Sequence, residues 1–325
     1  MDKTENIAKQ DSMLLVSPAP HVRQKANTQS IMLDVIIAMC PALVASTIGF
    51  GWRALLVVAV CVISCVVFEF AFEKLCHRDV TVGDLSAIVT GMLLAFNLPS
   101  TIPLWQAVFG SLVAIVAVKQ LFGGIGRNFA NPAITARVVM LVSFSSSMTS
   151  YAAYGGPSKM FAAVDATSSA TPLVQMGSDA MPSLLDLFLG RHGGSLGETC
   201  ALALLIGFVY LLVRRVITWH TTVVFVGTVA LFTLALGQNP LEHVLTGGLL
   251  LGAIFMATDY STSPSTKWGK VIFGLGCGII TVLIRVFGGY PEGVSFAILL
   301  MNILTPYISA WTRRKPFGGV KENEK

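Results

Sequence analysis

The residues most able to do chemistry lie in one polar stretch, Asp165-Ala166-Thr167-Ser168-Ser169-Ala170-Thr171, and the last of them is the strongest candidate. A threonine hydroxyl can be esterified by a phosphoryl group, and the small residues before Thr171 would leave a modifying enzyme an exposed approach to its oxygen. Pro172 keeps the acceptor out of the middle of a continuing helix or strand. The alternative interpretation is that a Ser- and Thr-rich loop is merely solvated, since short motifs match by chance.

The chain around this stretch has the composition of an integral membrane protein. Of its 325 residues, 54% are hydrophobic and 12% are charged, and the mean hydropathy is +0.73. Soluble domains carry about 25% charged residues. The composition therefore excludes a soluble protein, and membrane lipid is an expected partner.

Ten apolar stretches are expected to be membrane helices in an all-α fold, several of them near the roughly 20 residues that cross a bilayer. They are approximately 31–50, 54–72, 84–97, 104–118, 132–144, 199–213, 221–236, 243–257, 271–286 and 294–311. The third and the fifth are short for full spans, so we expect broken or buried helices there.

The distribution of Lys and Arg predicts the orientation, because short cytoplasmic loops retain basic residues. If the N-terminus is inside, 17 of the 22 basic residues fall on inner segments, three (Arg53, Lys159 and Arg191) on outer segments, and Arg137 and Arg285 within spans. Both termini are then cytoplasmic and the Thr171 loop lies on the outer face. The net charge of +5 follows from this topology and gives no reason to expect a nucleic-acid partner.

Short internal similarities predict two related halves. Leu121-Phe122-Gly123-Gly124 resembles Val286-Phe287-Gly288-Gly289, and Thr90-Gly91 resembles Thr246-Gly247. Five helices per half force the second half to run upside down, and inverted repeats place functional sites near the midplane. The expected organisation is an N-terminal tail (1–30), a first repeat (31–144), an outer loop (145–198), a second repeat (199–311) and a C-terminal tail (312–325).

A second candidate site is the segment Gly123-Gly124-Ile125-Gly126-Arg127-Asn128-Phe129-Ala130-Asn131-Pro132-Ala133, on the cytoplasmic side of the fifth stretch. Its glycines permit close backbone approach, and the amides of Asn128 and Asn131 can pair with an amide-bearing ring. A tight turn with capping Asn residues explains the same pattern equally well. Arg137, in the following short helix, could stabilise an anionic ring or pair with Glu69, because ionisable residues at membrane depth are functional candidates.

The stretch ending at Thr171 resembles the flavin-acceptor motif of the NqrB/RnfD family, the membrane subunits of Rnf complexes and of the Na⁺-translocating NADH:quinone reductase. The family pattern is Asp, two variable residues, Ser or Thr, Gly, Ala, Thr, and Ser169 stands here in place of the usual Gly. The resemblance covers nearly the whole chain, and its short N-terminal tail favours the RnfD branch.

This resemblance implies FMN joined covalently through its phosphate to Thr171, and a non-covalent riboflavin near Asn128, Asn131 and Arg137. Asp165 would be recognised by the flavin transferase, or would simply keep the loop hydrated. The resemblance further implies a urea-transporter-like fold in a bacterial inner membrane, with other subunits of an Rnf-type complex as partners. Its function would be electron transfer between ferredoxin and NAD, coupled to movement of Na⁺ or H⁺.

Two other functions remain open from the residues alone. A small-solute channel of the same inverted-repeat fold would contain no flavin, and an assembly scaffold would use the outer loop to dock a flavoprotein. The six cysteines include no Cys-x-x-Cys pair, and no His pair has haem-ligand spacing within a span, so a self-contained iron–sulfur cluster and haem are not expected. No metal site is expected either.

Overall fold

The computed structural model describes residues 27–152, 154, 168–169, 171–173, 175–176, 181–288 and 292–313. The described chain is almost entirely helical, as the all-α prediction requires. Its single strand pair is the antiparallel bridge between β1 (Tyr151–Ala152) and β2 (Ser168–Ser169).

The elements of the first part of the chain are α2 (Thr28–Phe50), α3 (Trp52–Leu75), the 3₁₀ turn η1 (Val82–Asp84), α4 (Ser86–Phe96), α5 (Leu104–Leu112), the π-helical segment η2 (Val113–Gln120), α6 (Pro132–Ser143) and α7 (Ser145–Met148). After β1 and β2 follow α8 (Leu184–Leu189), α9 (Ala201–Val213), α10 (Trp219–Ala235), α11 (Pro240–Leu245), α12 (Leu249–Leu251), the π-helical segment η3 (Gly252–Met256), α13 (Lys267–Phe287) and α14 (Val294–Trp311).

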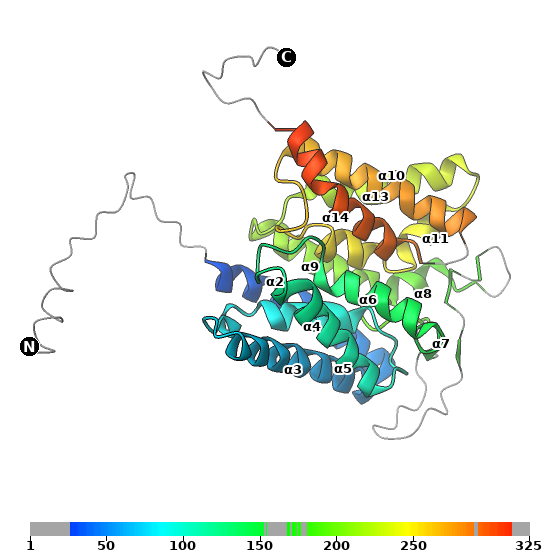
Figure 1. Cartoon of the computed structure of the whole chain (residues 1–325). Coiled ribbons are helices and arrows are strands. Elements are labelled where there is room, and N and C mark those ends of the chain that lie inside the picture. Colours follow the sequence, from blue (N-terminus) through cyan, green and yellow to red (C-terminus); the bar gives the residue numbers. More distant parts are fainter. Residues whose placement is uncertain are drawn as a thin grey trace, which may run out of the picture.

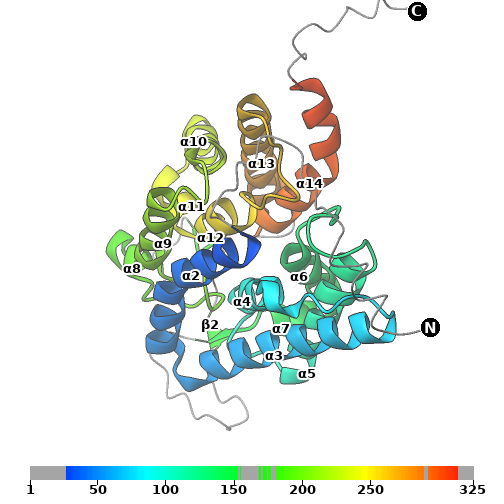
Figure 2. The same cartoon turned by 90° about the vertical axis from the view of Figure 1, so that its left-hand side faces the viewer.

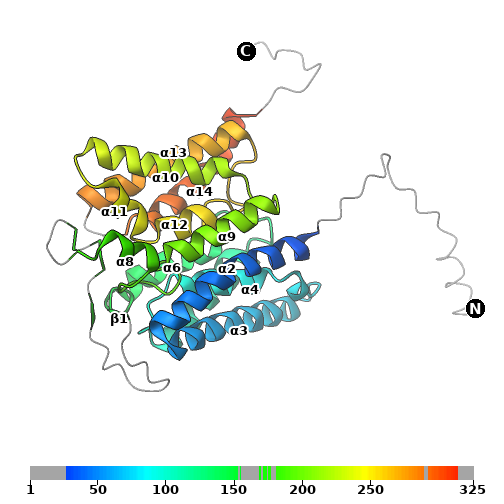
Figure 3. The same cartoon turned by 180° about the vertical axis from the view of Figure 1, so that it is seen from behind.

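The helices form two packed groups that meet along the middle of the molecule. Helices α2 to α5 lie on one side and α10, α13 and α14 on the other, with α6, α8 and α9 between them (Figure 1). The view from behind shows the same order (Figure 3). Contacts of α2 with α9 and of α6 with α14 join the groups. At the first of these, a Cβ on Gly207 would lie 2.3 Å from the carbonyl oxygen of Ala38, so only glycine allows this approach.

Within the described residues, four helices are long and apolar enough to cross a membrane, namely α2, α3, α13 and α14. Shorter apolar helices occupy 86–96, 104–120, 132–143, 201–213 and 219–235. Large apolar side chains remain exposed along the outer helix faces, for example Ile48 at 74%, Leu231 at 70% and Tyr307 at 75%. Such extensive apolar exposure fits a lipid-facing surface, and the protein is a multi-pass membrane protein.

The predicted third and fifth stretches are indeed short helices, α4 and α6, with 11 and 12 residues. The main correction concerns the eighth stretch, 243–257, which is not continuous. It is interrupted between α11 and α12, where Gly247 and Gly248 both have positive φ values of 67° and 66°. Short helices therefore end or begin inside the molecule, and Figure 2 shows α4 and α12 near its centre.

Candidate functional site

Thr171 is buried in the folded protein, with 5% of its surface exposed. Pro172 begins a turn in which the Gln175 N–H donates to the Pro172 carbonyl at 3.1 Å. The side chain of Leu173 reaches Gly247 at the break between α11 and α12. The exposed approach expected for the acceptor oxygen is therefore wrong for the folded state, because this turn packs against the second group of helices.

The motif before Thr171 is attached to the rest of the molecule through β2. Ser169 pairs with Tyr151, and Ser168 with Ala152, in antiparallel register. Only the backbone of the two serines is described, and Asp165 and Ala170 lie outside the described residues. The acceptor motif is thus held by backbone pairing on one side and by the Pro172–Leu173 turn on the other.

Tyr151 connects this motif to a buried polar cluster between the two groups of helices. Its hydroxyl donates to Glu292 Oε1 at 2.8 Å, and the other carboxylate oxygen of Glu292 forms an ion pair with Arg137 Nη2. Nη1 of Arg137 donates to Asn97 at 2.7 Å and to Ser295 at 3.1 Å. These five residues come from the end of α4, from α6, from β1 and from the start of α14, so the cluster joins both halves of the chain.

A second carboxylate, Glu198, adjoins this cluster in the buried segment before α9. Its Oε1 accepts from the Ser195 N–H at 3.1 Å, and its Oε2 is buried without a hydrogen-bond partner among the described residues. A Cβ on Gly248 would lie 2.8 Å from that oxygen. Burial and the negative charge of Glu292 raise the pKa of Glu198 to about 7, against the opposing effect of Arg137.

A separate buried ion pair lies in the first group of helices. Lys119 Nζ, on η2, donates to the two carboxylate oxygens of Glu69 at 2.6 and 2.8 Å and to Ser86 Oγ at 2.6 Å. Glu69 is fully buried and Lys119 is 2% exposed. The proposed pairing of Arg137 with Glu69 is therefore wrong, because each has a nearer partner of opposite charge on an adjacent element.

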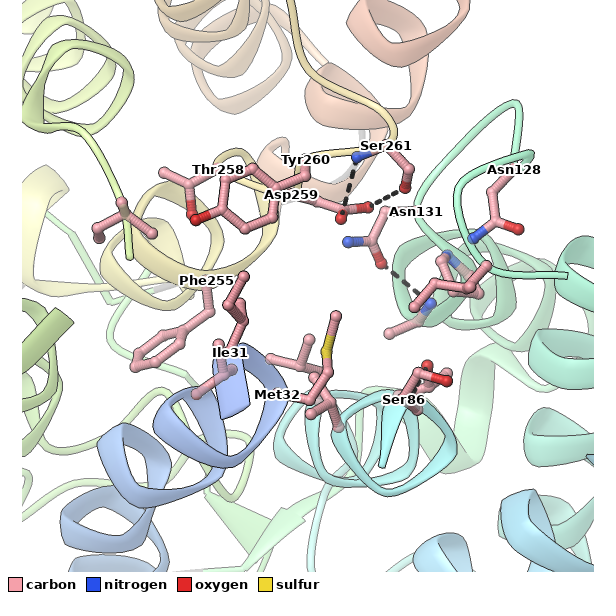
Figure 4. A pocket seen from close by; sticks show the side chains of 18 of the residues that line it. Ile31, Met32, Ser86, Asn128, Asn131, Phe255, Thr258, Asp259, Tyr260 and Ser261 are labelled. Carbon is pink, nitrogen blue, oxygen red and sulfur yellow. Dashed lines mark hydrogen bonds between the residues drawn. The ribbon is translucent and has the colours of Figure 1, made fainter. Parts of the chain in front are cut away.

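The asparagine-containing segment borders a cavity between the two groups of helices. The cavity is lined from α2, α4, η2, the loop before α6, η3 and the loop after η3, and its volume is about 100 Å³. Its lining is mostly apolar with a few polar groups, as in small-molecule sites, but the cavity is smaller than the roughly 300–1,000 Å³ that such sites measure. Figure 4 shows Met32 and Phe255 on one side and the polar residues Asn128, Asn131, Asp259 and Ser261 on the other.

The two asparagines differ in how they are used. Asn131 is the N-cap of α6, because its Oδ1 accepts from the N–H groups of Ala133 and Ile134 at 3.1 and 3.3 Å, and Pro132 follows at the first helical position. Asn128 Oδ1 is buried and has no hydrogen-bond partner among the described residues. An unsatisfied buried amide beside a cavity is the kind of group that a ligand satisfies.

The structure thus brings Asn128 and Asn131 together at one cavity and places Arg137 elsewhere, in the cluster beside the acceptor motif. Little in the sequence singles out Glu198, Glu292 or Tyr151, because each lies outside the ten apolar stretches and resembles an ordinary loop residue. Of the three, only Glu198 has a usable sequence signal. It is an acidic residue two positions before Cys200, the N-cap of α9, and therefore lies at the edge of an apolar stretch.

Comparison with known proteins identifies a family and several relatives that span most of the chain. The sequence model of the NQR2, RnfD, RnfE family matches residues 15–318. The chain is 48% identical to the D subunit of the Na⁺-translocating ferredoxin:NAD⁺ oxidoreductase complex of Acetobacterium woodii, over 95% of this chain and 96% of the relative. It is 40% identical to the D subunit of the proton-translocating ferredoxin:NAD⁺ oxidoreductase complex of Clostridium ljungdahlii, over 94% and 97%.

A third relative is the D subunit of the ion-translocating oxidoreductase complex of Halorhodospira halophila, 36% identical over 92% of this chain and 94% of that protein. The family match and these relatives extend over nearly the full described structure, from α2 to α14. The chain therefore belongs to the NQR2, RnfD, RnfE family.

Proposed function

We propose that this chain is the membrane subunit of an ion-translocating ferredoxin:NAD⁺ oxidoreductase complex and carries electrons through FMN esterified to Thr171. Family membership and relatives with that activity in their names support the class of complex. The position of Thr171 supports the attachment, because the acceptor lies beside a buried polar cluster that joins the two groups of helices.

FMN, when bound, supplies one- and two-electron chemistry, and the protein supplies its position and electrostatic surroundings. Thr171 Oγ1 would hold the phosphate, and the β1–β2 bridge and the Pro172 turn would fix the loop. Because Thr171 is buried after folding, the transferase would act before the loop docks, and Asp165, Ser168, Ser169 and Ala170 form the motif it would recognise. Ser169 in place of Gly is then compatible with attachment, since its backbone is extended.

We assign a second, non-covalent riboflavin to the cavity beside Asn128. Apolar walls from α2 and η3 suit an aromatic ring system, and Asn128 Oδ1 offers an acceptor to a ring N–H. Asn131 caps α6, and Figure 4 places its amide nitrogen toward the cavity. Arg137 is outside this cavity and would act on the flavin of Thr171 through Glu292 and Tyr151.

The remaining features of the proposal concern arrangement in the membrane. The chain would form two inverted five-helix repeats, 31–144 and 199–311, in the urea-transporter-like manner, separated by an outer loop. Both termini, 1–30 and 312–325, would lie in the cytoplasm of a bacterium, with lipid and the other subunits around the helices. The coupling ion would be Na⁺ or H⁺, as in the two relatives whose names specify one.

The experiment that tests the covalent flavin is a denaturing gel under ultraviolet light. The complex is purified from its own host as wild type, Thr171→Ala and, as the matched control, Thr167→Ala, which changes a variable position of the motif. We expect a fluorescent band in the wild type and in Thr167→Ala, and none in Thr171→Ala. A dark wild-type band would favour the alternative, a small-solute channel without flavin.

A further inference from the structure

Arg285 of α13 reaches across the break between α11 and α12. Its Nη1 donates to the carbonyl of His243 at 2.6 Å, and its Nη2 donates to the carbonyls of Thr246 and Gly247 at 3.0 and 3.2 Å. These bonds explain part of its presence in an apolar helix, because the carbonyls at a helix break need donors.

Two nitrogens at this break remain unexplained. Arg285 Nε and His243 Nδ1 are both buried and have no hydrogen-bond partner among the described residues. His243 is 4% exposed and faces the charge of Arg285, and both burial and that charge disfavour a protonated imidazole. The imidazole is therefore neutral and has one N–H to donate. With the imidazole proton on Nδ1, His243 and Arg285 Nε present two donors at this break, and the described residues supply no acceptor for either.

Arg53 shows that an arginine can bind the carbonyls at a helix break without leaving its Nε unpaired. Arg53 binds the break between α4 and α5, where its Nε donates to the Ser100 carbonyl at 2.7 Å and its Nη2 donates to the carbonyls of Thr101 and Ile102 at 3.4 and 3.2 Å. Both arginines serve the same structural purpose. Of the two, only Arg285 has a buried nitrogen that lacks an acceptor among the described residues.

The guanidinium of Arg285 lies near the turn that follows the acceptor threonine. A Cβ on Gly247 would meet Leu173 Cδ1 at 2.2 Å and Arg285 Nη2 at 2.7 Å, so Leu173 and the guanidinium converge on one point. Thr171 is two residues before Leu173, and its Cα therefore lies within about 7.6 Å of that of Leu173. That separation is within reach of an arginine side chain and a phosphate ester.

We propose that Arg285 and His243 bind the phosphate of the ester on Thr171, Arg285 by its charge and Nε–H and His243 by its ring N–H. This proposal rests on the proposed function. A phosphodiester keeps one negative charge, and an anion at a side chain that is only 5% exposed needs a cation and hydrogen-bond donors. Arg285 and His243 would be positioning residues that hold the flavin without reacting.

The test is a thermodynamic cycle on the complex purified from its own host. Heat stability of this subunit is measured by immunodetection of the soluble fraction after heating, for wild type, Thr171→Ala, Arg285→Gln and the double variant. We expect Thr171→Ala to lower the wild-type midpoint by a few degrees, because the bound phosphate is lost. In the Arg285→Gln background the same change should shift the midpoint little, whereas an equal shift in both backgrounds would overturn the proposal.

Two further variants keep the test decisive. Arg53→Gln is the matched control and should retain the full flavin-dependent shift, whereas His243→Phe should reduce it and also serves if Arg285→Gln does not fold. Every variant that keeps Thr171 must still give the fluorescent band. Loss of the band in Arg285→Gln would mean that Arg285 is needed for flavin attachment, and would overturn its proposed role in binding the phosphate. A dark wild-type band would instead refute the covalent flavin itself.

Discussion

The Tyr151 hydroxyl donates a hydrogen bond of 2.8 Å to Glu292, while the Tyr151 backbone pairs with Ser169 of the acceptor motif. One residue thereby ties the loop that precedes Thr171 to the ion pair between Glu292 and Arg137. Movement or a change of charge at either end can reach the other through a single side chain.

Replacing Tyr151 by Phe should weaken this connection. The change leaves Glu292 Oε1 buried without its donor, which costs about 1–3 kcal/mol. We expect the heat stability of the subunit to fall, whereas Tyr307→Phe, at a position 75% exposed, should change little. Equal effects of the two substitutions on the unfolding midpoint would contradict the role of the hydrogen bond.

Removing one member of the Lys119–Glu69 pair should destabilise the protein more than replacing both members by apolar residues. Lys119→Met leaves Glu69 charged and fully buried, and loss of one member of a buried pair costs about 3–5 kcal/mol. Adding Glu69→Leu should restore most of the stability. Asp34→Asn is the control, because its partner Arg214 is 56% exposed and keeps water around its charge when the pair is broken, so the loss should be smaller than for Lys119→Met. A double variant as unstable as Lys119→Met would refute this account.

Glu198 should make the stability of the folded protein depend on pH. Its pKa is raised from 4.5 to about 7, so the folded state binds the proton more tightly than the unfolded state. Its contribution to stability is therefore full below about pH 4.5 and is lost as the pH rises through about 7, by up to about 3 kcal/mol. Glu198→Gln stays neutral and keeps an acceptor for the Ser195 N–H.

The measurement is the unfolding midpoint of wild type and Glu198→Gln at pH 5 and pH 8. The difference between the two proteins isolates the contribution of Glu198 from the contributions of the other titrating groups. We expect the unfolding midpoint of Glu198→Gln, relative to that of the wild type, to be higher at pH 8 than at pH 5. Parallel behaviour at both pH values would show that Glu198 does not titrate in this range.

Asn128→Ala should lower the non-covalent flavin content while leaving the covalent flavin in place. The substitution removes the unsatisfied Oδ1 of a residue that lines the cavity. Flavin is released by acid precipitation of the purified complex and measured per mole of subunit. Asn239→Ala, which removes the cap of α11 away from the cavity, is the control. Unchanged acid-soluble flavin in Asn128→Ala would reject this cavity as the binding site.

Much of the fold follows from the sequence, because membrane helices are determined by local hydrophobicity. All ten apolar stretches contain helix, and the short third and fifth stretches are short helices in the structure. The break at Gly247 and Gly248 is not predicted, since the residues around it are as apolar as those of a continuous helix. A hydropathy profile reports how apolar a segment is, but it does not report where the backbone changes direction.

The site is less predictable, because its partners come from distant parts of the chain. The charge distribution places Lys119 with the cytoplasmic loops, yet it is 2% exposed and binds Glu69 fifty residues earlier. Arg137 is a functional candidate from the sequence, but its partner Glu292 is 155 residues away and resembles a loop carboxylate. One sequence provides residue types and spacings, and the pairing of such charges depends on how the helices pack.

The most direct test of the central claim is the mass of the tryptic peptide between Lys159 and Arg191, which contains Thr171. The peptide is isolated from the native-host complex and fragmented. The covalent-flavin account predicts a peptide heavier than its sequence by one FMN less one water, with the added mass on Thr171. An unmodified peptide from a host with active flavin transferase, or a flavin on another residue, would contradict it.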